Sequence, residues 1–307
     1  MSDIQFSRST VIRGKLESAY GVETPPGAND AAFEVSNLSY KRLDGSRPAR
    51  ESVDPYFGHP GELPGRHYSS LGFSTYVRKV GTPGDKPDID PLLQACGLAA
   101  VITGGQDVTY NPVQKALKSM TFWAHLNGHL HKVVGARGSL QLSGELGGQL
   151  RAQFSFQGLP KGSPADEAFP TIARPDGCVD ALDGDNCSVT LFGTPLQIVS
   201  FSIDLQNQLQ HIVTSAGEQI AITNRAATGE LVVIKPSVSE FDYHAKEADP
   251  CATGTLELTA GGLQISAPAV SLGTVTDLGD HNGVATVTLP LMFRRSAGND
   301  DLLLKFS

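Results

Sequence analysis

The stretch TFWAHLNGHLHKVV, residues 121–134, decides the fold class of this chain. Residues with apolar and polar side chains alternate on both sides of Asn127-Gly128, and both residues of that pair tolerate the positive φ angles of a type I′ turn. The pattern predicts a two-stranded hairpin in which Leu126 lies opposite His129. We therefore expect a fold built from antiparallel strands.

Similar alternation occurs on both sides of this hairpin along the chain. It predicts strands over residues 33–40, 70–77, 139–142, 150–156, 187–192 and 196–205. With 33 Gly and 19 Pro among 307 residues, long helices are disfavoured. One short helix is predicted over residues 90–97, with Asp90 as N-cap, Pro91 at the first helical position and Gly97 as the stop.

The chain contains a weak internal repeat. Residues 121–128 align with residues 255–262 at a constant offset of 134, and residues 138–156 match residues 272–293 in pattern. This favours two copies of one mostly-β unit. The alternative is a single copy followed by an unrelated β domain, because alternating sequences align easily with one another.

Composition divides the chain into four parts. Residues 1–30, interrupted by Pro25-Pro26-Gly27, are predicted to be an extended N-terminal arm, and residues 31–175 a first β domain. Residues 176–187 are predicted to be an acidic linker loop, and residues 188–307 a second β domain. Within the first domain, the segment of residues 44–69 is rich in Pro, Gly and Arg and is predicted to be a long loop.

Charge differs between the two halves. The formal charge is −8, with 18 basic and 16 acidic side chains in residues 1–175 but 6 and 16 in residues 176–307. This balance argues against a protein that holds nucleic acid by neutralising phosphates. No apolar run approaches the length of a membrane helix, and residues 1–8 lack a signal-peptide pattern. We therefore expect no membrane partner and synthesis in the cytoplasm.

The cysteines do not point to a metal or redox site. Cys96, Cys178, Cys187 and Cys251 include no CxxC pair, which disfavours zinc ribbons and thioredoxin-type chemistry. A disulfide between Cys178 and Cys187 stays open as an alternative, although a reducing cytosol keeps thiols free.

Three histidines raise the question of a metal site. The predicted hairpin places His129 and His131 on one face and His125 on the other, so at most two of them point the same way. The acidic segment of residues 176–187 lacks EF-hand spacing. Asp300 and Asp301 are predicted to lie in a solvated turn, and Trp123 in the core.

No catalytic motif is present. The sequence has no nucleophile elbow, P-loop, zinc-protease motif or dinucleotide fingerprint. We therefore predict that the protein is not an enzyme, with no catalytic, cofactor-binding or metal-binding residue and no cofactor.

The order of several motifs resembles that of a known family. Glu17-Ser18-Ala19-Tyr20-Gly21 is followed by Asp90-Pro91-Leu92-Leu93, by Tyr110-Asn111-Pro112, and then by residues 118–138, which end in Gly135-Ala136-Arg137-Gly138. Over residues 10–158 this order is similar to that of the tail tube proteins of long-tailed, siphovirus-type bacteriophages. The resemblance implies a mainly-β fold of two packed β-sandwich or partial-barrel tail-tube-like domains, with a short flanking helix in at least the first.

The resemblance also implies a function. Such a protein is a virion component, located in the tail, whose stacked rings form a tube that conducts DNA during infection. Two domains per chain imply trimeric rings with pseudo-sixfold symmetry, and one domain implies hexameric rings. The implied partners are other copies of the chain and the tape measure, terminator and tip proteins, with DNA only as transient cargo in the lumen.

The sequence adds physical expectations to this resemblance. An acidic lumen wall would repel DNA phosphates, and the arm and the loop of residues 44–69 are natural contacts between rings. The alternatives are a minor tail, tip or terminator protein, or a non-catalytic β protein that binds a ligand such as a carbohydrate.

Overall fold

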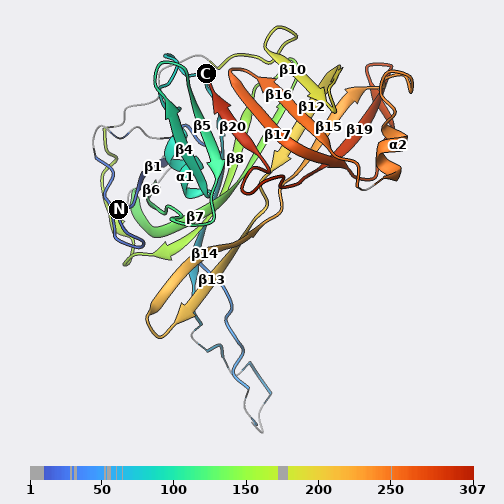
Figure 1. Cartoon of the computed structure of the whole chain (residues 1–307). Coiled ribbons are helices and arrows are strands. Elements are labelled where there is room, and N and C mark those ends of the chain that lie inside the picture. The colour runs from blue at the N-terminus through green and yellow to red at the C-terminus, as the bar shows by residue number, and fades with distance from the viewer. Residues whose placement is uncertain are drawn as a thin grey trace.

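The protein is a mainly-β molecule. The computed structural model describes residues 10–27, 30, 33–51, 53, 57–59, 61–63, 65–171, 179–249 and 251–307. Within these residues it has twenty strands and two short helices, α1 (Asp90–Ala95) and α2 (Tyr243–Ala248), as Figure 1 shows. None of the described helices is long and apolar enough to cross a membrane. The predicted mainly-β fold class is confirmed.

The hairpin of residues 121–134 forms as the sequence predicts. Strands β6 (Met120–Leu126) and β7 (His129–Glu145) are joined by Asn127 and Gly128, whose φ angles are 54° and 87°. Leu126 lies opposite His129 and Ala124 opposite His131. The segment predicted as a separate strand at residues 139–142 is the continuation of β7.

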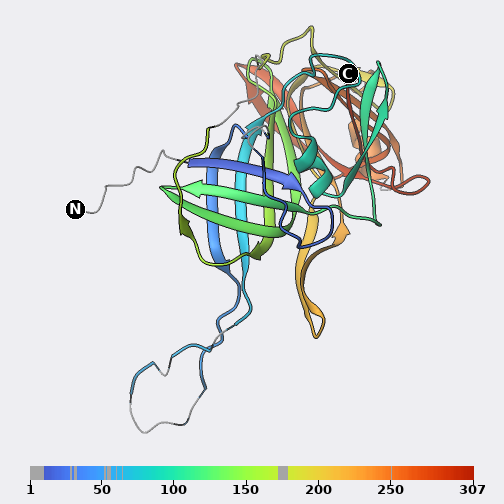
Figure 2. The same cartoon turned by 90° about the vertical axis from the view of Figure 1, so that its left-hand side faces the viewer.

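The first half of the chain is a bent sheet wrapped around one core. Its strands are hydrogen-bonded in the order β1 (Thr10–Leu16), β6, β7, β8 (Arg151–Pro160), β3 (Tyr68–Tyr76) and β2 (Ser36–Asp44). The pairing of β7 with β8 is irregular between Val134 and Arg137, where Gly135 has a φ of 62°. In Figure 2 the β1 end of this sheet crosses in front of β2 and β3.

The second half repeats this order with different strands. Its strands are hydrogen-bonded in the order β10 (Cys187–Leu191), β16 (Gly254–Ala260), β17 (Leu263–Leu272), β19 (Val284–Phe293), β15 (Thr228–Ile234) and β12 (Ile198–Asp204). Strands β6 and β16 begin and end 134 residues apart, at the offset of the sequence repeat. Helix α1 lies between β3 and β6 in the chain, and α2 lies between β15 and β16.

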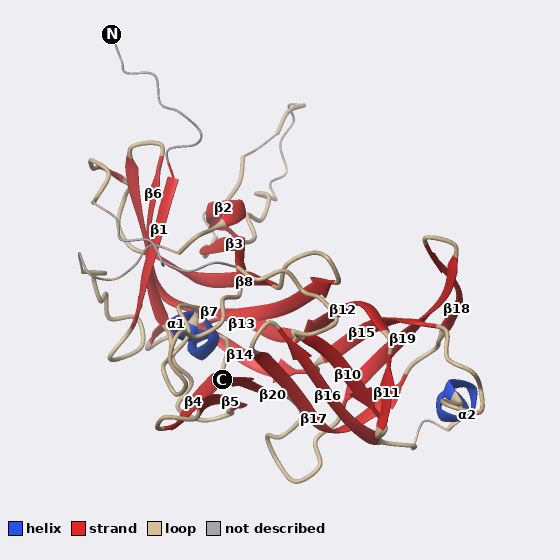
Figure 3. Cartoon of the chain, turned by 90° about the horizontal axis from the view of Figure 1, so that it is seen from above, coloured by secondary structure: helices blue, strands red, loops and turns tan. Residues whose placement is uncertain are grey.

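Two pairings join the halves. The C-terminal part of β7 pairs with β12, from Gln141 opposite Asp204 to Glu145 opposite Ser200. Strand β20 (Leu303–Phe306) pairs with β17 on one side and with β5 (Asp107–Pro112) on the other, and β5 pairs with β4 (Leu98–Thr103). Figure 3 shows the two halves side by side, with β7 and β12 at their junction.

Short strands complete the structure. β9 (Ala165–Asp166) pairs with the start of β7, β11 (Thr194–Leu196) pairs with β10, and β18 (Thr276–His281) pairs with β19. Strands β13 (Asn207–Thr214) and β14 (Gly217–Arg225) form a separate hairpin between β12 and β15. The equivalent place between β2 and β3 holds the long loop, now bounded as residues 45–67.

The core is continuous across both halves. Phe73, Phe122, Phe154 and Phe156 pack against one another in the first half, with ring centroids 4.9–6.4 Å apart. Tyr110 of β5 packs edge to face on Phe306 of β20, at 5.7 Å. Each fully buried side chain of this size stabilises the fold by about 1.5–3 kcal/mol. Burial of one cluster therefore holds both halves together.

The structure corrects three predictions. Residues 10–16 of the predicted arm form β1 because Ile12 is fully buried and β1 pairs with β6, whereas residues 1–9 lie outside the described part. Helix α1 forms and ends at Ala95, with Cys96 as its C-cap and Gly97 directly after it at a φ of 82°, but Ile89 is its N-cap and Asp90 its first residue. Trp123 is only half-buried and not part of the core, and Lys132 Nζ lies over its ring at 4.6 Å from the ring centroid.

Candidate functional site

Two segments that carry the family resemblance, residues 17–21 and 132–138, meet in space. The carboxylate of Glu17 is buried and accepts four hydrogen bonds, from Ser119 Oγ at 2.6 Å, Gly135 N at 2.7 Å, Gly21 N at 2.8 Å and Thr121 Oγ1 at 2.9 Å. One side chain thus fixes the turn after β1 to the bend of β7. A buried carboxylate needs several donors of this kind to offset its lost hydration.

Tyr20 and Arg137 extend this contact to the second half of the chain. Tyr20 Oη accepts from Ile220 N at 2.5 Å, and Arg137 Nη1 donates to Ile220 O at 2.8 Å. The Arg137 guanidinium lies over the Tyr20 ring at 4.8 Å and also donates to Leu117 O at 3.1 Å. Both backbone groups of one β14 residue are therefore held by these two side chains. We call Glu17, Tyr20, Gly135 and Arg137 the clamp.

Burial sets the charges within the clamp. It raises the pKa of Tyr20, which keeps the phenol neutral at physiological pH. It also lowers the pKa of Arg137, an effect that the nearby Tyr20 and Glu17 oppose. Gly135 fits because a Cβ there would lie 2.8 Å from Tyr20 Cζ and its φ is positive.

The β13–β14 hairpin is held at a second point. Arg225 at the end of β14 makes a two-pronged ion pair with Asp301, with Nη2–Oδ1 and Nε–Oδ2 distances of 2.6 and 3.0 Å. Asp301 is therefore buried, which corrects the prediction of a solvated turn for this residue. Its neighbour Asp300 does lie in an exposed turn, where the N–H groups of Ala297 and Ser296 lower its pKa.

The hairpin and the loop of residues 45–67 extend from the same side of the molecule (Figure 1). The base of the loop contacts the hairpin near its tip: Arg66 Nη1 lies 2.6 Å from Glu218 Oε1, and Glu218 Oε2 lies 3.0 Å from His211 Nε2 of the opposite hairpin strand. Tyr68 packs edge to face on His211 at 5.7 Å. We call the loop and the hairpin the two projections. The loop presents Val53 and Phe57 fully to solvent.

A polar face runs across both halves of the main sheet. Two rows of directly opposed residues cross β3, β8, β7, β12, β15 and β19. The first row consists of Ser74, Gln153, Gln141, Asp204, Thr228 and Met292. The second row consists of Tyr76, Arg151, Ser143, Ser202, Glu230 and Pro290. Because the alternate residues of these strands are buried, the rows form the outer side of the sheet. They contain one basic and two acidic residues, and we call them the polar sheet face.

The predicted histidine positions are confirmed by the strand register. His125 is buried and its Nε2 lies 3.3 Å from Glu167 Oε1. On the other face, His129 Nδ1 lies 2.7 Å from Asp166 Oδ1, and the His131 ring packs on Tyr40 at 5.1 Å. Burial lowers the pKa of His131, which favours its neutral form. Within the described residues, no three His, Cys, Asp or Glu side chains are grouped as a metal site.

The described part of the acidic linker, residues 179–187, is held by its own side chains. Asp183 Oδ1 accepts from the N–H groups of Asp185 and Asn186, both at 3.0 Å. Leu182 is buried and exchanges backbone hydrogen bonds with Gly147 and Gly148 of the first half. Cys178 lies outside the described residues, so the open disulfide alternative is not tested, and Cys187 is a buried free thiol.

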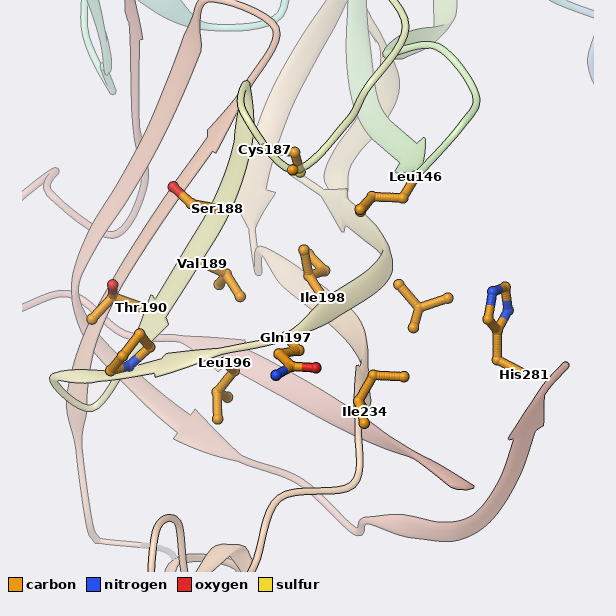
Figure 4. Close-up of a pocket in the computed structure, with 13 residues that line it drawn as sticks. Leu146, Cys187, Ser188, Val189, Thr190, Leu196, Gln197, Ile198, Ile234 and His281 are labelled. Carbon is orange, nitrogen blue, oxygen red and sulfur yellow. The ribbon is translucent and has the colours of Figure 1, made fainter. Parts of the chain in front are cut away.

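The second half has an apolar cleft, shown in Figure 4. Its walls come from β10, β11 and β12, with Leu146 from the first half and Ile234 and His281 from neighbouring strands. Among the described residues that line it there is no carboxylate, and the one aromatic side chain is that of His281. The cleft therefore lacks both the acid–base pair of a glycosidase and the aromatic platform expected of a carbohydrate site.

Sequence reasoning missed the clamp. Residues 17–21 and 132–138 are visible as motifs, but Glu17 and Gly135 are 118 residues apart and nothing local indicates that they touch. The signal available was the composition of the motifs themselves: an acid before a Tyr-Gly pair, and an arginine between two glycines.

Comparison with known protein families gives a match to this chain. The family model of the phage tail tube protein matches residues 7–294, which is nearly the whole chain and includes the clamp, both projections and the polar sheet face. No curated protein sequence matches the chain.

Proposed function

Because the chain belongs to the phage tail tube protein family, we propose that it polymerises into the tube of a phage tail, and that this tube conducts DNA during infection. The family makes it a structural protein of the virion tail. The observation that carries the proposal further is the polar sheet face, which crosses both halves without interruption.

We further propose that the chain contains two tube domains, residues 10–175 and 188–307, joined by the acidic linker of residues 176–187. The support is the pairing order, which is the same in both halves over six strands each. Helices α1 and α2 and the two projections also occupy equivalent places in the chain. Three chains would then supply the six domains of a ring.

The polar sheet face is the proposed lumen wall. The basic side chains of a positively charged wall would bind the DNA phosphates and retain the DNA, whereas hydroxyl and amide groups neither attract the DNA strongly nor repel it strongly. Gln141 Nε2 already donates to Ser202 Oγ at 3.0 Å, so these groups satisfy one another across the sheet. The chain's acidic excess is not gathered on this face, so the wall that we propose is close to neutral and differs from the acidic wall expected from net charge.

The two projections are the proposed contacts between stacked rings. They extend in one direction, and the ion pair of Arg66 with Glu218 joins the base of the loop to the hairpin near its tip. A tube also needs partners at its ends and inside it during assembly, for which terminator, tip and tape measure proteins are the expected candidates.

Electron microscopy and ring mass test the proposal. Purified protein should form hollow rings or tubes, and native mass spectrometry should find rings of three chains of 32.4 kDa each. Rings of six chains would contradict the two-domain proposal. A protein that stays monomeric at all concentrations would contradict polymerisation and favour a minor tail component.

A further inference from the structure

The acidic linker between the halves carries a large apolar side chain into the core. Leu182 is fully buried, while its neighbours Ala181 and Asp183 are exposed. A linker that served only as a tether would have no need to bury an apolar side chain. The linker therefore has a further structural role.

The Leu182 side chain fills the space where the two halves meet. A Cβ at Gly144 of β7 would lie 2.6 Å from Leu182 Cδ1 and 2.7 Å from Phe201 Cε1, so this close approach requires a glycine. Gly144 and Phe201 are directly opposed in the pairing of β7 with β12. On its other side, Leu182 Cδ2 lies 3.5 Å from the position that a Cβ would take at Gly261, in the turn between β16 and β17. Leu182 therefore lies between elements of both halves.

Backbone hydrogen bonds hold Leu182 in this position. Gly147 N donates to Leu182 O at 2.7 Å and Leu182 N donates to Gly148 O at 2.8 Å, which fastens the linker to the first half. Gly261 N donates to Asn186 O at 3.1 Å, which fastens it to the second half. The linker is therefore a spacer of fixed position between the two halves.

Strand pairing by itself leaves the angle between the halves open. Adjacent strands in a sheet are twisted by about 10–35° relative to each other, so the pairings of β7 with β12 and of β20 with β5 are compatible with a range of about 25°. The side chains packed at the junction select one value within this range. A chain that turns by about 120° closes a ring of three, and one that turns by about 90° closes a ring of four. The range that the pairings allow is therefore close to the difference between these ring sizes.

We infer that Leu182 sets the angle between the two halves and, through this angle, the number of chains in a ring. The inference rests on the proposed two-domain ring and adds the residue that determines its size. Leu182 is a positioning residue, which acts within one chain by spacing β7 from the turn between β16 and β17.

Leu182→Ala tests this role, because it removes the spacing side chain and keeps the linker backbone. Spin labels on Ser18→Cys and Thr255→Cys, at exposed positions of the first and second half, report the distance between the halves by pulsed electron paramagnetic resonance. The labelled chain also carries Cys178→Ser and Cys251→Ser, and it is diluted with unlabelled chains of the same variant so that distances within one chain are measured. We expect Leu182→Ala to widen the distance distribution about twofold. Native mass spectrometry should find the share of three-chain rings reduced to about half or less, with larger and open assemblies in their place.

Leu289→Ala is the matched control. Leu289 is equally buried, in β19, and lies opposite Leu231 within the second half. Both substitutions leave a cavity of the same kind and should lower the urea midpoint to a similar extent. Leu289→Ala should nevertheless leave the label distances and the ring mass unchanged. Leu182→Val keeps part of the side chain and should give intermediate values, and it replaces Leu182→Ala in every comparison if the alanine variant does not fold.

The outcomes separate this inference from the proposed function. Label distances and ring masses of the Leu182 variants that match those of the wild type, or changes no larger than those of Leu289→Ala, would overturn the role of Leu182 and leave the tube intact. A wild-type chain that forms no rings would overturn the proposed function. In that case an unchanged distance distribution in Leu182→Ala would overturn the control of the angle as well, and a widened one would support it.

Discussion

At the scale of single residues, stability depends on a few buried polar groups. Glu17 accepts from two backbone N–H groups and two hydroxyls, which only an anionic or doubly accepting side chain can satisfy. Each hydrogen bond to a buried charge contributes about 1.5–3 kcal/mol. A substitution that removes the acceptor oxygens of this one side chain therefore leaves several buried donors without a hydrogen bond.

We expect Glu17→Gln to lower the free energy of unfolding by about 2–3 kcal/mol, because the amide presents donors to donors. Urea denaturation measures the change. Glu62→Gln is the matched control, since Glu62 is half-exposed and lies 3.8 Å from Arg47, and it should change stability by less than about 1 kcal/mol. Equal effects of the two variants would contradict the role of Glu17.

The ionisation of Tyr110 makes the free energy of unfolding depend on pH in the alkaline range. Burial, together with a 2.7 Å hydrogen bond to Asp90 Oδ1, raises the pKa of this phenol in the folded protein. An unfolded tyrosine ionises near pH 10, so the stabilising contribution is complete below about pH 10 and is lost as pH rises further. Tyr110→Phe should weaken the fall in stability above about pH 10, measured by urea denaturation across pH. An unchanged slope would show that Tyr110 does not ionise on unfolding.

At the scale of elements, the clamp holds a hairpin of one half against the other. Arg137→Ala removes the hydrogen bonds to Ile220 and Leu117 but leaves the core untouched. We expect amide exchange in β13 and β14 to rise about tenfold, which corresponds to about 1.4 kcal/mol, with little change in β8 or β16. Hydrogen exchange with mass spectrometry measures this.

Arg151→Ala is the matched control for the clamp. Arg151 also lies over a tyrosine ring, that of Tyr76, at 5.1 Å, but it is exposed and is not hydrogen-bonded to the hairpin. Its loss should leave exchange in β13 and β14 unchanged. Faster exchange in both variants would mean that the hairpin responds to charge in general.

The elements also show which structure is readable from sequence. The β6–β7 hairpin was predictable because Asn127-Gly128 imposes a turn on adjacent strands, and α1 because Pro91 and Gly97 bound it. Asp90 was misassigned as a cap because its carboxylate instead serves the distant Tyr110. The hairpin of β13 and β14 lacks an Asn-Gly turn, and β20 depends on β5, almost 200 residues earlier, so local pattern could not predict either. The clamp was out of reach for the same reason.

At the scale of the whole molecule, the proposal that the polar sheet face is a near-neutral lumen wall predicts a measurable effect of added charge. Gln153→Lys together with Ser143→Lys adds two positive charges to the polar sheet face. We expect rings to assemble normally but to retain short duplex DNA, with binding that weakens steeply as salt rises. Fluorescence anisotropy of labelled DNA measures it. Thr255→Lys at an exposed position of β16, combined with Thr223→Lys at an exposed position of β14, gives the same added charge elsewhere, and equal retention by that control would contradict the lumen proposal.

The two projections differ although they occupy equivalent places, one a Pro- and Gly-rich loop and the other a clamped hairpin. In a ring of three chains, three loops and three hairpins would alternate around the rim. Neighbouring rings could then dock in three symmetry-equivalent orientations and not in six. A rotation by one sixth of a turn would place each projection on the docking site of the other kind. The joint between rings would therefore have one distinct orientation, and every ring along the tail would be rotated by the same angle relative to the ring before it.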